Sequence, residues 1–230
     1  MESNFPSTPL LAAGDRICFE GDSQTSRGVS PTGTSWAYAR MSNWQSLYSD
    51  MVEEWLFANL PEFKLTFRNA ARGGSSIHDL EERYETFVKP YAPSLFIFTL
   101  GNNDARKFDN PQQCVARTSA YLERLQSDSP CRLLYIGVFE ACPGGEENVT
   151  AVCERARPFN LALARMVIDR GGSFLNIGEV LKRKATRLRE QSKYHTVYAE
   201  GRHLNSLGSE IVAGQVLRAL GAYQLLEQNS

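Results

Sequence analysis

Four short segments of the chain combine glycine with side chains that can donate hydrogen bonds or transfer protons. They span residues 21–25, 69–76, 101–104 and 200–203. Acyl transfer through a serine needs a hydroxyl nucleophile, a base that takes its proton, and a group that orients the base. It also needs hydrogen-bond donors directed at the oxyanion that forms during the attack. Because the four segments together contain all of these groups, they predict acyl-transfer chemistry.

The four segments supply a candidate for each of these groups. Ser23 is the candidate nucleophile, and His203 is the candidate base. Glu200 lies three residues before His203, from where its carboxylate can reach the second imidazole nitrogen. The candidate oxyanion donors are the backbone N–H groups of Ser23 and Gly74 and the side-chain amide of Asn103. Taken singly, these residues also fit helix caps and tight turns, so the prediction depends on their being brought together.

Four further residues are expected to contact the substrate: Asp22, Arg27, Trp36 and Glu140. Arg27 and Trp36 lie in a segment, 24–44, that is longer than a simple strand-to-helix connection. Trp36 either stacks on a sugar ring or packs the base of this loop. Arg27 either binds a substrate carboxylate or phosphate or lies at the surface. Glu140 follows the fourth expected strand, in a second loop over the same cleft.

The elements that must position these residues alternate along the chain. Strands are expected at 17–19, 63–67, 94–100, 133–138 and 173–176, and amphipathic helices are expected between them. The first helix should include 44–55, and a later one should be kinked at, or begin at, Pro158. This alternation predicts an α/β fold, a single-domain three-layer α/β/α sandwich with a five-stranded parallel sheet. Ligands of such sheets bind at the carboxyl ends of the strands, where the first three segments begin, and the fourth segment lies in the loop before the last expected helix.

Composition limits the classes of protein that remain. The chain has 230 residues, 42% of them hydrophobic, and a net charge of −1. These values exclude disordered, collagen-like, coiled-coil and membrane-spanning classes. Without a linker or repeat, residues 1–230 are expected to form one domain with a core at about 15–221. A cluster of basic residues at 182–193 is expected to be a solvated helix face, so nucleic acid is not an expected partner. No amphipathic membrane helix is apparent in the sequence, so a membrane is not an expected partner either.

The remaining cysteines and histidines suggest no cofactor. None of the five cysteines forms a C-x-x-C pair, and no spacing typical of metal ligands occurs, so neither metal nor cofactor is expected. His195 is the alternative candidate for the base, whereas His78 is expected to be solvated. The first residues lack the features of a signal peptide, which makes a cytoplasmic location the expectation. The oligomeric state stays open.

In order and spacing, the four segments resemble the SGNH (GDSL-type) hydrolase family. The first resembles the family's GDS block, the second has Asn69 followed five residues later by Gly74, and the third reads G-x-N-D. The resemblance extends from about residue 17 to 220 and implies a flavodoxin-like SGNH-hydrolase fold. It places Ser23 as nucleophile, Gly74 and Asn103 in the oxyanion hole, and His203 as base. Glutamate stands at position 200 where the family usually has aspartate; if it points elsewhere, Ser23 and His203 would act as a dyad.

These features predict a serine ester hydrolase that acts through an acyl-serine intermediate. The expected substrates are short-chain (acetyl) esters of a carbohydrate or small metabolite, since no long apolar lid is visible in the sequence. The alternatives are a lysophospholipase or thioesterase-type acylhydrolase, or an acyltransferase that uses the same residues. A non-catalytic binding module and a phosphate-binding domain are further alternatives, although the chain lacks the G-x-x-x-x-G-K-[ST] and G-x-G-x-x-G motifs.

Overall fold

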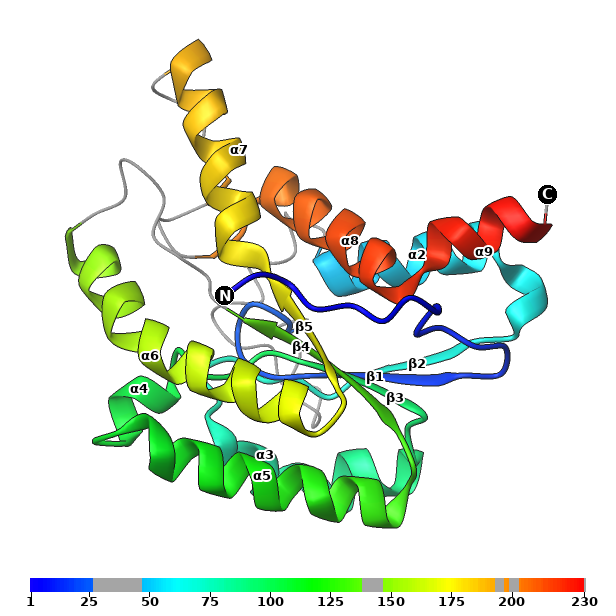
Figure 1. Cartoon of the computed structure of the whole chain (residues 1–230), viewed down its shortest axis with the longest axis horizontal. Coiled ribbons are helices and arrows are strands. Elements are labelled where there is room, and N and C mark those ends of the chain that lie inside the picture. The colour runs from blue at the N-terminus through cyan, green and yellow to red at the C-terminus, as the bar shows by residue number, and fades with distance from the viewer. Residues whose placement is uncertain (27–46, 138–146, 193–196, 199–202, 230) are drawn as a thin grey trace.

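Five short parallel strands form one sheet in the order β2-β1-β3-β4-β5 (Figure 1). The computed structural model describes residues 1–26, 47–137, 147–192, 197–198 and 203–229. The strands are β1 Arg16–Glu20, β2 Thr66–Asn69, β3 Leu95–Phe98, β4 Arg132–Gly137 and β5 Ser173–Asn176. The predicted five-stranded parallel sheet is therefore confirmed.

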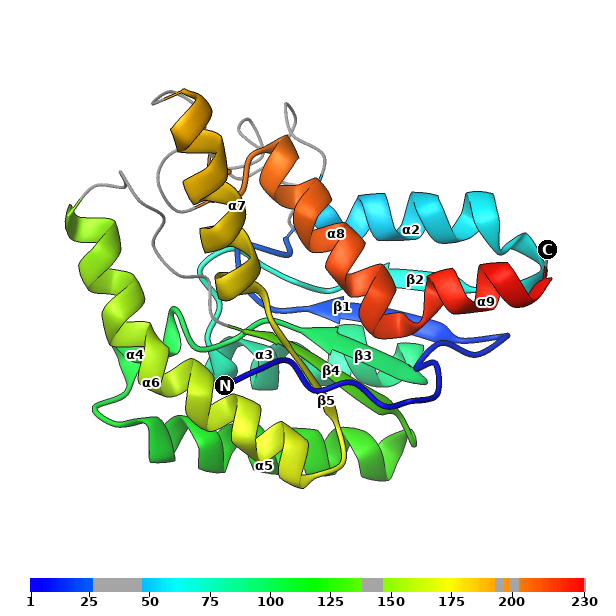
Figure 2. The same ribbon diagram turned by 45° about the horizontal axis from the view of Figure 1, so that its top comes forward.

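Helices cover both faces of this sheet (Figures 1 and 2). On one face lie α2 Tyr48–Asn59, α7 Ile177–Gln191, α8 Ser206–Leu220 and α9 Ala222–Asn229. On the other lie α3 Ile77–Arg83, α4 Asp104–Lys107, α5 Pro111–Asp128 and α6 Glu147–Asp169. Three short helical turns complete the described elements: η1 Pro61–Phe63, η2 Tyr84–Val88 and η3 Lys89–Tyr91. The predicted three-layer α/β/α arrangement is confirmed.

The two-residue repeat of the strands divides the apolar core between the two faces. In β3, Leu95 and Ile97 pack into the cluster beneath α2 and α8. Their neighbours Phe96 and Phe98 pack into the cluster beneath α3 and α5. Successive side chains of a strand point to opposite faces, so a central strand must be apolar throughout. This explains why 94–100 reads as a continuous apolar run.

Some boundaries differ from the prediction. The second strand is Thr66–Asn69 rather than 63–67, because Pro61–Phe63 is a 3-10 turn and Lys64 adopts a left-handed conformation with φ 52°. Helix α6 begins at Glu147, so Pro158 lies inside it and does not start it. Helices α4 and α9 are additional to the predicted elements. Among the described helices, none is both long and apolar enough to cross a bilayer.

The register of the sheet brings the first three strand ends together. Phe19 of β1 pairs with Asn69 of β2, and Glu20 pairs with Phe98 of β3. The chain leaving β1 therefore emerges between the segments that follow β2 and β3. The Arg72 N–H donates to the Gly21 carbonyl oxygen at 3.1 Å, which continues this pairing beyond the strands. Three of the four sequence segments thus meet at one edge of the sheet.

Candidate active site

The turn that follows β1 requires glycine. Gly21 has φ +139°, and a Cβ there would lie 2.1 Å from Thr99 Oγ1. An L side chain rarely adopts that φ and would also collide with β3's continuation. The absence of a side chain allows the chain to turn close against Thr99. Asp22 and Ser23 are thereby delivered to the carboxyl edge of the sheet.

Asp22 holds the turn together by accepting hydrogen bonds from the residues that follow it. Its Oδ1 accepts the Gln24 N–H at 3.0 Å, and its carbonyl oxygen accepts the N–H groups of Thr25 and Ser26 at 3.1 and 3.0 Å. The residue is only 2% exposed, and burial raises the pKa of its carboxyl group to about 6. Ser23 itself is half-buried. The predicted substrate contact of Asp22 does not fit this burial, because a substrate at the edge of the sheet would not reach its carboxylate.

Asn69 fastens the same turn to its neighbours. Its Nδ2 donates to the Thr25 carbonyl oxygen at 2.7 Å and to Ser49 Oγ at 3.1 Å. Its Oδ1 accepts the Ala71 N–H at 3.1 Å, which shapes the start of the next loop. One amide therefore joins the turn after β1, the first turn of α2 and the loop after β2. Sequence reasoning assigned Asn69 no role of its own beyond its place in the second block.

The loop after β2 lies beside the nucleophile turn. A Cβ placed on Gly73 would be 3.9 Å from Ser23 Cβ, so the glycine pair passes close to the serine. Gly74 is exposed and has φ +79°. Among the described residues, none accepts the Gly74 N–H. The Nδ2 of Asn103 donates to the Ser75 carbonyl oxygen at 3.1 Å, which places the asparagine against this loop.

Asp104 holds the third segment in place. Its Oδ1 accepts the Ile77 N–H at 2.8 Å, and its Oδ2 accepts the Gly101 N–H at 2.9 Å. Asp104 is fully buried, and burial raises the pKa of its carboxyl group. These bonds connect the turn after β3 to the N-terminus of α3. Because Asn103 precedes Asp104 directly, its amide is positioned by the same contacts.

His203 reaches the serine from the other end of the chain. Its Nε2 lies 2.9 Å from Ser23 Oγ, a hydrogen-bonding distance. Tyr198 and Leu204 form an antiparallel bridge on either side of the histidine. Asn205 then caps α8 by accepting the Gly208 N–H at 2.9 Å. The bridge and the cap fix the point at which the chain enters α8, and so the position of His203.

The remaining candidate residues are those for the orienting group, the substrate contacts and the alternative base. Glu200, Arg27, Trp36 and Glu140 lie outside the described residues, as does the alternative base, His195. His78 is half-buried, and its ring stacks on Phe108 with centroids 5.0 Å apart. No group of three or more metal-ligating side chains occurs among the residues that the structure describes.

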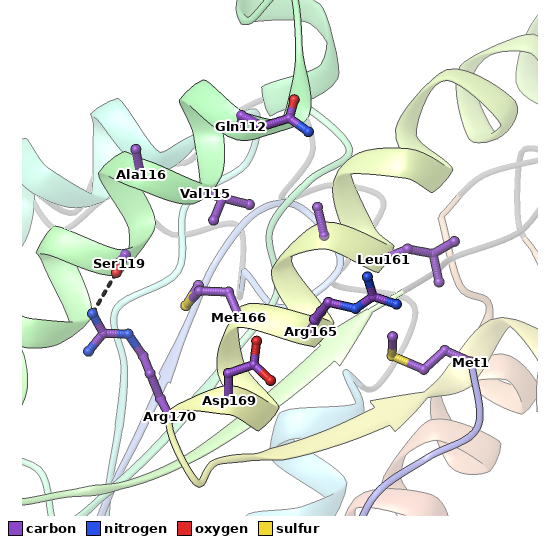
Figure 3. A pocket seen from close by; sticks show the side chains of 11 residues that line it. Met1, Gln112, Val115, Ala116, Ser119, Leu161, Arg165, Met166, Asp169 and Arg170 are labelled. Atoms are coloured by element: carbon purple, nitrogen blue, oxygen red, sulfur yellow. Dashed lines mark hydrogen bonds between the residues drawn. The ribbon is translucent and has the colours of Figure 1, made fainter.

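A groove of about 1170 Å³ lies elsewhere, between α5 and α6 and beside Met1 (Figure 3). Its walls combine apolar side chains, such as Val115 and Met166, with the charged side chains of Arg165 and Asp169. No described residue of the four segments lines it. The groove is therefore separate from the edge of the sheet where Ser23 and His203 meet.

Comparison with known proteins agrees with this geometry. Residues 19–211 match the GDSL-like Lipase/Acylhydrolase family. No curated protein sequence matches the chain. Among solved structures, LAE5, an alpha/beta hydrolase enzyme from the metagenome of Lake Arreo, superposes with TM-score 0.73 at 21% identity, covering 93% of this chain and 98% of its own.

A second similar structure is Axe2, an acetylxylan esterase from Geobacillus stearothermophilus. It superposes with TM-score 0.70 at 18% identity, over 92% of this chain and 96% of its own. Identities this low show a shared fold, whereas the family match covers most of the sequence. The chain belongs to the GDSL-like Lipase/Acylhydrolase family and is a carboxylic ester hydrolase.

Proposed function

We propose that the enzyme cleaves its ester through a covalent acyl-serine at Ser23. The observation that carries this proposal is the 2.9 Å separation of His203 Nε2 and Ser23 Oγ. His203 takes the proton as Oγ bonds to the acyl carbon, and then gives it to the leaving alcohol as the ester C–O bond breaks. In the second half-reaction, His203 takes a proton from water as the water oxygen bonds to the acyl carbon. It then returns this proton to Ser23 Oγ as the acyl–Oγ bond breaks, which releases the acid and restores free Ser23.

The oxyanion of both tetrahedral intermediates needs donors that are in place before the attack. We assign this role to the N–H groups of Ser23 and Gly74 and to the Asn103 amide. Asn103 Nδ2 has two protons, and only one is used by the Ser75 carbonyl oxygen. The second proton, together with the unaccepted Gly74 N–H, supports this assignment.

Glu200 is proposed to orient His203. Its carboxylate would accept the proton on the imidazole nitrogen that faces away from Ser23, which stabilises the imidazolium formed during catalysis. Replacement by glutamine tests this role, because the amide keeps the shape and loses the charge. A Glu200→Gln variant that matches the parent from acid to neutral pH would show that Ser23 and His203 act as a dyad.

For the substrate, we propose acetyl or similarly short acyl esters of a carbohydrate or small metabolite. The fold similarity to an acetylxylan esterase supports a glycan ester. Arg27, Trp36 and Glu140 are the proposed contacts of the alcohol part, with Trp36 stacking on a sugar ring. Asp22 is better assigned to holding the nucleophile turn, since it is 2% exposed.

A panel of esters tests the substrate class. Acetylated xylo-oligosaccharides, other acetylated sugars, and p-nitrophenyl acetate, octanoate and palmitate are compared, with Ser23→Ala as the control. The proposal expects kcat/KM to be highest for acetyl esters and turnover to be absent from the Ser23→Ala variant. A preference for palmitate would instead indicate a lipase-type acylhydrolase, and transfer to an added alcohol in preference to water would indicate an acyltransferase.

A further inference from the structure

A buried ion pair lies directly behind the nucleophile turn. Arg83 Nη2 in α3 lies 2.6 Å from Oε1 of Glu20, the last residue of β1. The side chain of Glu20 is 0% exposed and that of Arg83 is 7% exposed. The same Oε1 accepts the Gly21 N–H at 2.9 Å. One carboxylate oxygen therefore joins the helix on one face of the sheet to the residue that starts the turn carrying Ser23.

The second amino group of the Arg83 guanidinium contacts the loop after β2, which contains the proposed oxyanion donor Gly74. Arg83 Nη1 donates to Ser75 Oγ at 2.7 Å. Ser75 follows Gly74, and its carbonyl oxygen accepts the Asn103 amide at 3.1 Å. Arg83 thus connects the nucleophile turn, through Glu20, with the residue that lies between both proposed oxyanion donors.

Stability alone does not account for this pair. Burying two charges carries a desolvation cost that their attraction often fails to offset, and apolar replacements are frequently neutral or stabilising. Burial is the largest influence on Glu20 and raises the pKa of its carboxyl group to about 7, although Arg83 opposes that rise. Glu20 Oε2 and Arg83 Nε also lack hydrogen-bond partners in the described part of the chain. An incompletely satisfied pair in the core points to a role beyond packing.

We infer that Glu20 and Arg83 are positioning residues, which hold Ser75, and through it Gly74 and Asn103, in register with Ser23. The inference rests on the proposed function, because it concerns the geometry of the same oxyanion hole. Arg83 does not touch the substrate and acts through Ser75. Small displacements of groups that stabilise a transition state reduce kcat strongly while leaving substrate binding nearly unchanged.

A matched ion pair at the opposite end of the sheet provides the control. Asp15, which immediately precedes β1, pairs with Arg132 and accepts a hydrogen bond from Ser94 Oγ at 2.6 Å. This cluster repeats the carboxylate, arginine and serine of the pair behind the active site, but it lies where the strands begin. Arg132→Gln and Ser94→Ala are therefore the controls for Arg83→Gln and Ser75→Ala.

The experiment measures kcat, KM and melting temperature for these four variants on p-nitrophenyl acetate, each with Asn103 intact and with Asn103→Ala. Arg83→Gln and Ser75→Ala should lower kcat by about 10–100-fold and change KM by less than about threefold. In the Asn103→Ala background, the same changes should lower kcat by a smaller factor, because one of the two donors they position is already missing. The two controls should lower the melting temperature and leave kcat unchanged.

The experiment distinguishes failure of the positioning role from failure of a variant to fold and from failure of the proposed oxyanion donor. If kcat falls by the same factor in both backgrounds, or if Arg83→Gln and Ser75→Ala behave like the controls, the positioning role is overturned. If Arg83→Gln does not fold, Ser75→Ala alone decides the outcome, since it removes only a hydroxyl group. If Asn103→Ala by itself leaves kcat unchanged, Asn103 is not an oxyanion donor, and this inference fails together with that part of the proposed function.

Discussion

His203 Nε2 lies 2.9 Å from Ser23 Oγ, although the two residues are 180 positions apart in the chain. Ser23 comes from the turn after the first strand, and His203 precedes the helix α8 that packs over the sheet. Parallel strands deliver the segments after them to one edge, which brings Ser23 there, whereas the Tyr198–Leu204 bridge and the start of α8 place His203 at the same edge. Substitutions around this pair should therefore reveal which contacts hold it and its surroundings in place.

Loss of the Asn103 amide should reduce turnover without unfolding the enzyme. Removal of one oxyanion donor typically lowers kcat by about 10²–10³-fold, and Asn103→Ala is expected to fall in this range. Asn102→Ala is the matched control, since the neighbouring amide oxygen contacts Asn160 Nδ2 at 3.4 Å on α6 instead of the loop at Ser75. Steady-state kinetics on p-nitrophenyl acetate measure both variants. Equal losses in the two would remove Asn103 from the oxyanion hole.

The cap of α8 should affect activity as well as stability. Asn205→Ala removes the acceptor of the Gly208 N–H and should lower the free energy of unfolding by about 0.5–2 kcal/mol. Because Asn205 lies two residues after His203, kcat should fall as well. Asn110→Ala removes the equivalent cap of α5, where Oδ1 accepts the Gln113 N–H at 3.1 Å, and should lower stability alone. Urea unfolding and kinetics on both variants distinguish the two effects; an unchanged kcat for Asn205→Ala would contradict the expectation.

Replacement of Gly21 by alanine should destabilise the fold more than the same replacement at Gly14, another glycine with positive φ. Gly14 has φ +77°, and a Cβ added there would meet no atom within 4 Å, whereas a Cβ on Gly21 would collide with Thr99. Gly14→Ala should therefore lower the free energy of unfolding by only the backbone strain, about 1–3 kcal/mol. Gly21→Ala should lower the free energy of unfolding by more than this, because β1 and β3 must also separate. Denaturant midpoints compare the two, and similar values would show that the turn adapts.

Burial of Asp22 should make stability depend on pH in a defined direction. The pKa of its carboxyl group rises from 3.8 to about 6 on folding, so the folded protein holds this proton more tightly than the unfolded chain. The contribution of this group to stability is present below about pH 4 and is lost as the pH rises to about 6. Asp22→Asn cannot titrate, so its stability relative to the parent should increase over this interval by up to ~3 kcal/mol.

Urea unfolding of the parent and the variant at pH 4, 5, 6 and 7 measures this trend. Any constant offset from the new amide group does not alter the slope. The exposed Asp109 supplies the control variant, Asp109→Asn. A stability difference between Asp22→Asn and the parent that is flat or decreases with pH would contradict the expected direction.

Much of the architecture could be predicted because local patterns decided it. The apolar run at 94–100 predicts β3, and an asparagine followed by a proline is typical of a helix start, as Asn110 and Pro111 are at the start of α5. The start of β2 could not be predicted in the same way. Residues 63–67 alternate like a strand, but the left-handed conformation of Lys64 interrupts the alternation, and a residue type does not reveal such a conformation.

The candidate site was also predictable only in part from the sequence. The order and spacing of glycine, asparagine and histidine indicated Ser23, which follows the first predicted strand, and His203, which lies in the loop before the last predicted helix. The Glu20–Arg83 pair gave no such signal. A glutamate at a strand end and an arginine in a charged helix both read as solvated residues, and only the packing of α3 against the sheet buries them together.

The central claim is that Ser23 forms the covalent intermediate with His203 as its base. The enzyme is treated with diethyl p-nitrophenyl phosphate, and peptide mass spectrometry locates the diethylphosphoryl group. We expect a single adduct on Ser23, with none on Ser23→Ala and a much slower reaction in His203→Ala. An active enzyme that remains unlabelled, or that carries the adduct on another residue, would contradict this claim.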